Sequence, residues 1–123
     1  MTEARIYLNA LIEIFKIEKK DFLGFAISKD NPLQYHHIIF KKDGGKTTLA
    51  NGAPLTAKAH NLFHTIARED YIISKKLTKE FKKLNESRIP PDKEYYKIVA
   101  YILNEYRVKK NKTKKEYIRN RVK

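Results

Sequence analysis

The sequence predicts an α+β protein that is mostly helical, in which a β-hairpin and the helix after it pack against flanking N- and C-terminal helices. Three observations indicate this fold class. Apolar residues recur at helical spacing towards both ends of the chain, a short aromatic and β-branched segment lies between them, and an Asp-Gly-Gly turn follows that segment. With 123 residues, the chain has room for a single domain with one modest hydrophobic core.

The N-terminal part of the chain predicts a helix and a loop. A helix is expected over residues 3–17, because apolar side chains occur at i, i+3, i+4 and i+7 from Leu8 onwards. Thr2 is suited to cap its N-terminus. Residues 28–32, Ser-Lys-Asp-Asn-Pro, predict a loop because Asp, Asn and Pro favour turns.

The middle of the chain predicts a hairpin followed by a helix. Residues 33–40, LQYHHIIF, are typical of a strand, and residues 49–55 are expected to pair back on it as a second, irregular strand. The turn sequence at residues 43–45 lies between them. Thr56 is suited to cap a helix that continues at least to Arg68.

The remainder predicts helical support. An apolar stripe runs from Ile73 to Leu84, and Asp70 is suited to cap a new helix there. One long helix is the alternative, since no Gly or Pro separates this stripe from the preceding helix. After a stop at Pro90-Pro91, Asp92 caps a last helix with the following apolar face: Tyr95, Ile98, Val99, Ile102 and Tyr106. We divide the single domain 1–123 into an N-terminal helix and loop (1–32), the hairpin and helix (33–68), helical support (69–106) and a basic C-terminal segment (107–123).

Charge is the strongest global feature of the sequence. The chain has 27 Lys and Arg residues against 14 Asp and Glu residues, a formal net charge of +13. Residues 107–123 hold nine basic residues and one acidic residue, so this segment contributes +8. Such an excess indicates attraction to a polyanion, with nucleic acid as the first candidate. The alternative for the segment alone is a solvated tail that keeps the protein soluble.

Composition also excludes some kinds of site. The chain has no Cys, so it can form neither a disulfide framework nor a Cys-ligated zinc site. Absence of Cys suits a reducing compartment, and we expect a cytoplasmic protein. No apolar run approaches the length of a membrane span, so no membrane partner is expected.

All four histidines lie between positions 36 and 64. His60 and His64 are four residues apart on a predicted helix, so they share one face and can chelate a divalent cation. Successive side chains of a strand point to opposite faces. If His36 supplies a third nitrogen, His37 is therefore free to act as a general base, since its pKa lies near neutrality. The alternative is that His60 and His64 are ordinary core or surface residues.

Several sequence elements occur in order over residues 35–64: Tyr35-His36-His37-Ile38-Ile39, Gly44-Gly45, Leu49-x-Asn51, Leu55 and His60-x-x-x-His64. Together they resemble the HNH endonuclease motif, also called the ββα-metal or His-Me finger. The order His-His, Gly-Gly, Asn, His is kept, and so is the nine-residue step from Asn51 to His60. The resemblance implies a hairpin packed on one helix, with a metal ion between them.

The resemblance also implies a role for each matched residue. His36, His60 and His64 would bind one divalent ion, as in the three-histidine site of colicin-type DNases, with zinc, nickel, magnesium or manganese as candidates. His37 would be the general base that takes a proton from the attacking water. Asn51 would tie down the loop so that the base is oriented. The implied activity is hydrolysis of phosphodiester bonds.

Two positions depart from the family pattern. Many members read Leu-Cys-x-x-Cys-His and bind a structural zinc with the two Cys, whereas residues 55–60 here read LTAKAH. That zinc is not expected, and the flanking helices must support the motif instead. Phe40 stands where Pro is common, with little expected consequence.

We expect nucleic acid as the partner, and double-stranded DNA in particular. Basic residues near the motif and in the last segment are candidate phosphate contacts: Lys41, Lys42, Lys46, Arg68, Lys109, Lys110, Lys112, Lys114 and Lys115. Arg68 shares the His64 face of the helix, and a simple surface charge is its alternative interpretation.

Three other functions compete with a nuclease. A non-catalytic nucleic-acid-binding module would have little need of His37. A protein in which the ion only stabilises structure would need neither His37 nor the net charge of +13. A zinc metalloprotease is disfavoured because the helix lacks the Glu of H-E-x-x-H.

Overall fold

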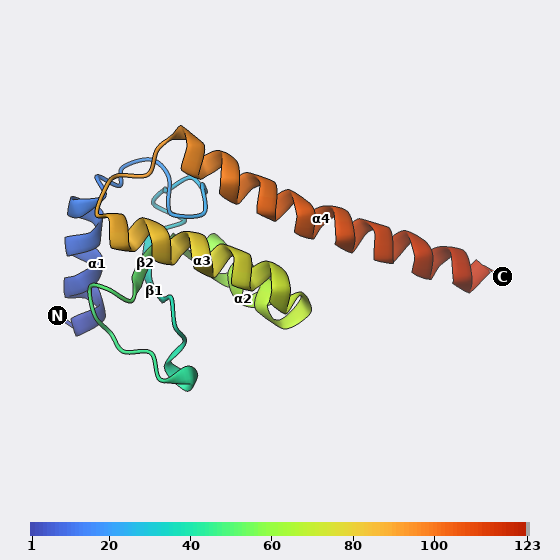
Figure 1. The fold of residues 1–123 in the computed structure, drawn as a ribbon, viewed down its shortest axis with the longest axis horizontal. Helices are drawn as coiled ribbons and strands as arrows, with labels where there is room; N and C mark the ends of the chain where they lie inside the picture. The colour runs from blue at the N-terminus through green and yellow to red at the C-terminus, as the bar shows by residue number, and fades with distance from the viewer. Residues whose placement is uncertain (123) are drawn as a thin grey trace.

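The computed structural model describes the backbone of residues 1–122 and the side chains of residues 1–112. Four helices, a two-stranded hairpin and a short 3₁₀ helix make up the described chain (Figure 1): α1 (Glu3–Ile14), β1 (Leu33–His37), η1 (Lys41–Asp43), β2 (Gly52–Thr56), α2 (Ala57–Glu69), α3 (Tyr71–Ser87) and α4 (Lys93–Val122). The prediction of a mostly helical α+β fold is confirmed.

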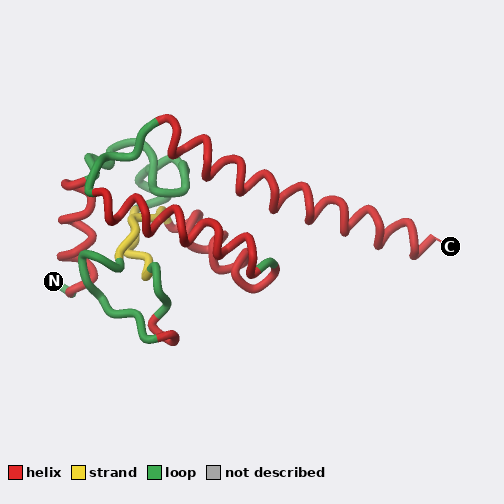
Figure 2. The backbone as a smooth tube through the Cα atoms, in the orientation of Figure 1, coloured by secondary structure: helices red, strands yellow, loops and turns green. Residues whose placement is uncertain are grey.

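The hairpin lies between α1 on one side and α2 with α3 on the other (Figure 2). Its strands are antiparallel, and His36 of β1 is opposite Ala53 of β2. Both strands contact α1 and α2, α2 packs on α3, and α3 packs on α4. The histidines of β1 and α2 are therefore brought to one side of the hairpin.

Each helix begins at a side chain that accepts a hydrogen bond from the first turn, because the first backbone N–H groups of a helix have no partner within it. The four caps are those predicted: Thr2, Thr56, Asp70 and Asp92. Asp70 separates α2 from α3, so the two-helix prediction is confirmed and one long helix is excluded.

A buried carboxylate fixes the start of α2. Asp21 is fully buried, and one of its oxygens accepts the backbone N–H of Thr56 at 2.7 Å. The other oxygen accepts the N–H groups of Leu23 and Phe25 at 2.8 and 2.9 Å. Because Thr56 also caps α2, its hydrogen bond to Asp21 fixes the position of the helix that carries His60 and His64.

The strands are shorter than predicted. The strand expected to reach residue 40 ends at His37, and β2 begins at Gly52, three residues later than predicted. The reason is the side chain of Asn51, which bonds both the N–H and the carbonyl of Ile39. It therefore occupies backbone groups that a longer ladder would have paired.

Two helix predictions are also corrected. The first helix ends at Ile14, three residues early, where the chain turns and Lys16 adopts a left-handed φ of 50°. Ile98, predicted on the buried face of the last helix, is 43% exposed. The other four predicted residues of this face are buried, and the buried stripe also includes Leu103, four residues after Val99, with Ile98 beside it.

Beyond Tyr106, α4 projects from the body of the protein, to which the side chains of Lys109 and Lys110 still link it (Figure 1). The described side chains of this part, residues 107–112, are exposed. Within the described residues, no helix combines the length and the apolar content that crossing a membrane requires.

Candidate metal centre

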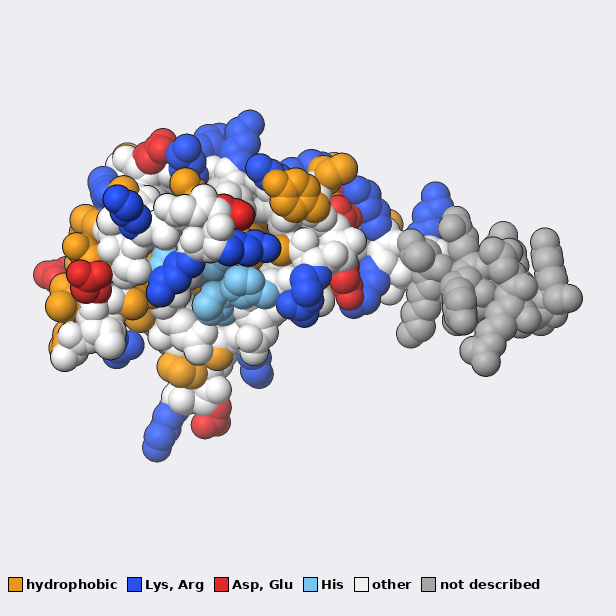
Figure 3. Space-filling view, turned by 90° about the horizontal axis from the view of Figure 1, so that it is seen from below, with side chains coloured by type: hydrophobic (Ala, Val, Ile, Leu, Met, Phe, Trp, Pro, Cys, Tyr) orange, Lys and Arg blue, Asp and Glu red, His pale blue; other side chains and the backbone are white. Residues whose placement is uncertain are grey.

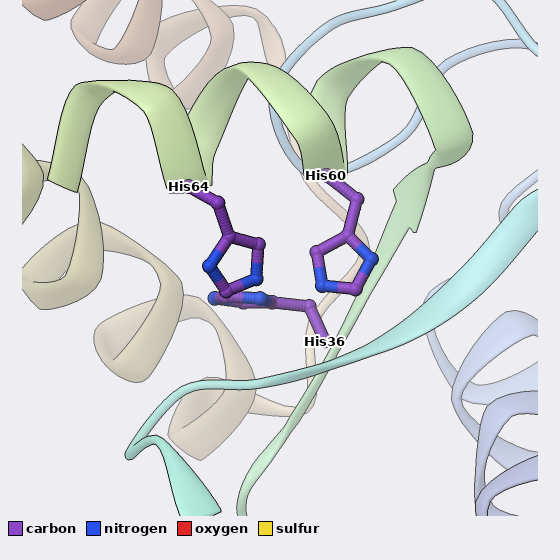
Figure 4. Close-up of side chains that lie close together, drawn as sticks. All are labelled: His36, His60 and His64. Atoms are coloured by element: carbon purple, nitrogen blue, oxygen red, sulfur yellow. The ribbon is translucent and has the colours of Figure 1, made fainter. Parts of the chain in front are cut away.

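Three histidines from β1 and α2 converge. His60 and His64 project from successive turns of α2, and His36 faces them from β1 (Figure 4). One ring nitrogen of each residue can be chosen so that the three nitrogens lie within 4.8 Å of one another. The structure therefore brings together the three residues that the sequence predicted as ligands, and a divalent ion would fit among them.

The most buried of the three is His36. Its side chain is 1% exposed, and neither ring nitrogen has a hydrogen-bond partner among the described residues. It is packed against Phe63, with ring centroids 4.7 Å apart. Buried polar atoms in proteins are nearly always satisfied, so one of these nitrogens is a candidate ligand for a metal ion.

Burial keeps this imidazole neutral. Burial lowers the pKa of His36 well below 6.5, and the neighbouring His60 and His64 lower it further. Burial also lowers the pKa of His60, with a further contribution from His64 and His37, and burial lowers the pKa of His64, with a further contribution from Arg68 and Lys42. Neutral imidazoles offer the lone pairs that a metal ion needs.

His60 is oriented by a residue that the sequence did not identify. Its Nδ1 lies 2.8 Å from Oε1 of Gln34 on β1. Since an amide oxygen can only accept, Nδ1 donates its proton there and Nε2 keeps a lone pair for an ion. The available signal was strand alternation, because Gln34 is two residues before His36 and so lies on the same face of β1.

His37 lies outside this cluster. Its Nε2 is 2.9 Å from the hydroxyl oxygen of Thr47, and its ring packs edge-on against Tyr35. His37 is nevertheless adjacent to His36 in the chain, on the opposite face of β1. Burial and the nearby Lys41 lower the pKa of His37 itself, which leaves it neutral and able to accept a proton at neutral pH.

Two side chains fasten the loop that carries Thr47. Asn51 accepts the N–H of Ile39 at 2.8 Å, and its amide donates to the carbonyls of Ile39 and Lys46 at 3.0 and 2.9 Å. The hydroxyl of Tyr35 donates to the carbonyl of Thr48 at 2.6 Å and accepts its N–H at 3.1 Å. The predicted tethering by Asn51 is present in the structure.

The Gly-Gly pair of the motif has a steric reason. A Cβ at Gly45 would lie 1.8 Å from the carbonyl oxygen of Ile39. Because that atom belongs to the backbone, the loop would have to move to relieve this clash. Gly44 adopts a left-handed φ of 92°, a conformation that side chains other than glycine disfavour.

The predicted phosphate contacts fall into two groups. Lys41, Lys42 and Arg68 line a cleft of about 760 Å³ that opens beside His64, whereas Lys46 is exposed on the loop and does not line it. Basic side chains flank the histidine surface on this face of the molecule (Figure 3). Arg68 and Lys42 both contribute to the lowered pKa of His64, after burial, which places them beside the metal centre.

The second group lies on α4 and is partly neutralised. Lys109 pairs with Asp70 at 3.9 Å and with Glu105 at 3.6 Å, and Lys110 pairs with Glu69 at 3.6 Å. These pairs join α4 to the corner between α2 and α3. Of the other predicted contacts on α4, Lys112 is exposed. Lys114 and Lys115 lie outside the side chains that the structure describes.

No protein family model, curated protein or solved structure matches the chain. The likeness to the HNH motif therefore depends on residues 35–64 themselves, through their order, their spacing and the geometry described above.

Proposed function

We propose that the protein is a cytoplasmic, metal-dependent endonuclease of the HNH type, which hydrolyses phosphodiester bonds in nucleic acid, with DNA as its expected substrate. One observation carries the proposal. The buried imidazole of His36 has no hydrogen-bond partner among the described side chains and faces two further histidines, while the adjacent His37 is packed separately on the loop. That arrangement provides three candidate metal ligands and a separate histidine that can act as a general base.

His36, His60 and His64 fit a divalent ion of the kind that imidazole prefers, such as zinc or nickel. The three ligands are neutral, so an ion would keep its full charge, polarise a phosphoryl oxygen and stabilise negative charge on the leaving oxygen. Lys42 and Arg68, beside His64, would bind neighbouring phosphates.

His37 would act on the water. Attack forms a bond from the water oxygen to phosphorus and breaks the bond to O3′, which leaves a 5′-phosphate and a 3′-hydroxyl. The proton of the water passes to the neutral His37 imidazole, a step that contributes about 10²–10⁴-fold to the rate, and the departing O3′ takes up a proton from solvent water. Thr47 engages Nε2 of this ring and leaves Nδ1 for the water.

Cleavage of supercoiled plasmid tests the proposal, with zinc, nickel, magnesium and manganese added in turn. His37→Ala should fold and bind metal as the wild type does, yet cleave at least about 10²-fold more slowly. His64→Ala should lose both metal affinity and cleavage, because it removes one of three ligands. Calorimetric titration with zinc measures the affinities.

Each of these experiments can reject one part of the proposal. Wild-type cleavage by His37→Ala would reject the general base, and unchanged zinc affinity in His64→Ala would reject the metal centre. A wild-type protein that binds zinc and DNA but cleaves neither DNA nor RNA would be the non-catalytic, metal-stabilised binding module instead.

A further inference from the structure

The cleft beside His64 is larger and more apolar than phosphate binding requires. It has a volume of about 760 Å³ and lies between the segment after β1 and the helices α2 and α3. Its walls include Phe40, Phe63 and two large apolar side chains that are open to solvent, Ile39 at 49% and Tyr71 at 65% exposure. An exposed apolar and aromatic wall next to a candidate reaction centre indicates a ligand with an apolar face.

The same cleft is basic. Four cationic side chains line it, Lys41, Lys42, Arg68 and Lys75, against the single acid Asp43. Among the described side chains, none of the four cations has a carboxylate within 4.0 Å. Their charge is therefore available to an anionic ligand.

Cations and aromatic rings are paired within the cleft. Nζ of Lys75 lies 5.3 Å from the ring centroid of Tyr71, and Nζ of Lys42 lies 5.7 Å from that of Phe40. The ring of Phe40 is in turn 5.3 Å from that of His64. Rings and positive charges are thus paired at two places in one cleft, beside His64 and at the start of α3.

A nucleotide combines the two chemistries that this cleft offers. A base stacks on an exposed aromatic ring, and its phosphate is bound by Lys or Arg, as in grooves that bind single strands. A base within continuous duplex is stacked and paired, and only an unpaired base can reach such a ring. A duplex backbone alone would leave the apolar wall without a partner.

We propose that the cleft binds an unpaired nucleotide next to the scissile phosphate, with its base on Tyr71 and its phosphate between Lys42, Arg68 and Lys75. The position next to the scissile phosphate rests on the proposed nuclease function. The protein therefore prefers single-stranded or frayed DNA to continuous duplex.

Binding without cleavage tests this inference, using fluorescence anisotropy with EDTA present. The probes are a labelled single-stranded oligonucleotide, a hairpin duplex with the same number of phosphates, and an abasic strand of the same length. Wild type should bind the single strand most tightly. Tyr71→Ala should weaken that binding about 5–150-fold, the equivalent of one lost base stack, and leave abasic binding unchanged.

Matched controls lie on exposed helix surfaces. Tyr101 on α4 is 74% exposed and does not line the cleft, so Tyr101→Ala should bind every probe as the wild type does. Tyr71→Phe retains the ring and should retain binding. Lys75→Gln should weaken all three probes more than Lys79→Gln, because Lys79 is exposed on α3 outside the cleft.

Equal binding of single strand and duplex by wild type, or equal losses in Tyr71→Ala and Tyr101→Ala, would overturn the inference. A loss in Tyr71→Ala that is the same for duplex and abasic strand would assign the cleft to a duplex backbone. Because EDTA removes metal ions, this binding assay does not depend on cleavage. The proposed nucleotide site and the proposed nuclease activity can therefore be rejected independently of each other.

Discussion

The imidazole of His36 is enclosed by protein, and in the metal-free protein this enclosure works against stability. Both ring nitrogens are buried without a hydrogen-bond partner in the part of the chain that the structure describes. A buried polar group left unsatisfied costs about 1–3 kcal/mol. An ion bound at one of these nitrogens would remove part of that cost, so metal binding would be linked to folding at this residue.

We expect the metal-free protein to lose stability as the pH falls below about 6.5. Burial lowers the pKa values of His36, His60 and His64 in the folded state, whereas histidines of the unfolded chain titrate near 6.5. The unfolded state therefore takes up protons first, and the free energy of unfolding decreases towards acid pH. Urea unfolding in EDTA at several pH values measures this dependence. His36→Leu should show a shallower one, and an identical dependence would contradict the argument.

Gln34 is expected to tune the metal centre without touching an ion. Gln34→Ala should weaken zinc binding about 10–100-fold, because His60 loses the acceptor that fixes its tautomer. Gln34 is exposed, so the substitution should leave folding intact. Zinc titration by calorimetry is the measurement. Gln34→Glu keeps an acceptor and should keep the affinity, whereas unchanged affinity in Gln34→Ala would remove Gln34 from the site.

At the scale of elements, the loop between β1 and β2 is held in a defined conformation by side chains from several elements. Side chains from β1, from the loop and from α3 all bond its backbone, the last being Asn85, whose amide donates to the carbonyls of Leu49 and Gly52 at 2.9 and 2.7 Å. The strand and helix types were predictable from residue pattern and caps. The strand ends were not, because Asn51 and Asn85 satisfy backbone groups through contacts that no local pattern reveals.

Gly45→Ala should separate catalysis from metal binding. The new Cβ would meet the carbonyl oxygen of Ile39 at 1.8 Å, so the loop and its hydrogen bonds to Asn51 must shift. A shift of about 1 Å near the base costs roughly 10²-fold in rate. Zinc affinity should persist, since the three ligands lie outside this loop. At Gly44 a new Cβ meets no atom within 4 Å, so only its left-handed φ of 92° opposes Gly44→Ala, which should lower cleavage less than Gly45→Ala. Wild-type cleavage by Gly45→Ala would show that the loop does not position the base.

At the scale of the whole molecule, the net positive charge could be predicted from the sequence, but the positions of the charged side chains in space could not. The histidine spacing predicted which ligands would converge, because helix and strand periodicity decide which side chains share a face. The cleft is built from three separate segments, after β1, late in α2 and early in α3. Tertiary packing alone brings these segments together. The pairing of Lys109 and Lys110 with acids at the α2–α3 corner was likewise hidden from the sequence.

The outer lysines of α4 are expected to set affinity for the phosphate backbone. Each phosphate contact adds about 0.9 to the slope of log affinity against log salt on duplex DNA. Replacing Lys112, Lys114 and Lys115 by Gln should therefore flatten the slope by up to roughly three units. The catalytic rate at saturating substrate should not change. Lys109 and Lys110 are left in place because they join α4 to the body.

The matched control removes the same charge elsewhere, by replacing Lys79, Lys82 and Lys83 on α3 with Gln. These lysines are exposed, and the substitutions should change the salt slope less. Equal slopes for the two triple variants would indicate a solubilising role for the C-terminal segment.

The projecting end of α4 would limit the length of duplex that the protein covers. From residue 107 to the end of the helix at Val122 there are 16 residues, and at 1.5 Å per residue they extend about 24 Å. Duplex DNA rises about 3.4 Å per base pair, so a duplex lying along this rod would be covered for about seven base pairs. The protected region should therefore be lopsided about the cut, longer on the side that α4 follows, and hydroxyl-radical footprinting of a frayed duplex would reveal the asymmetry.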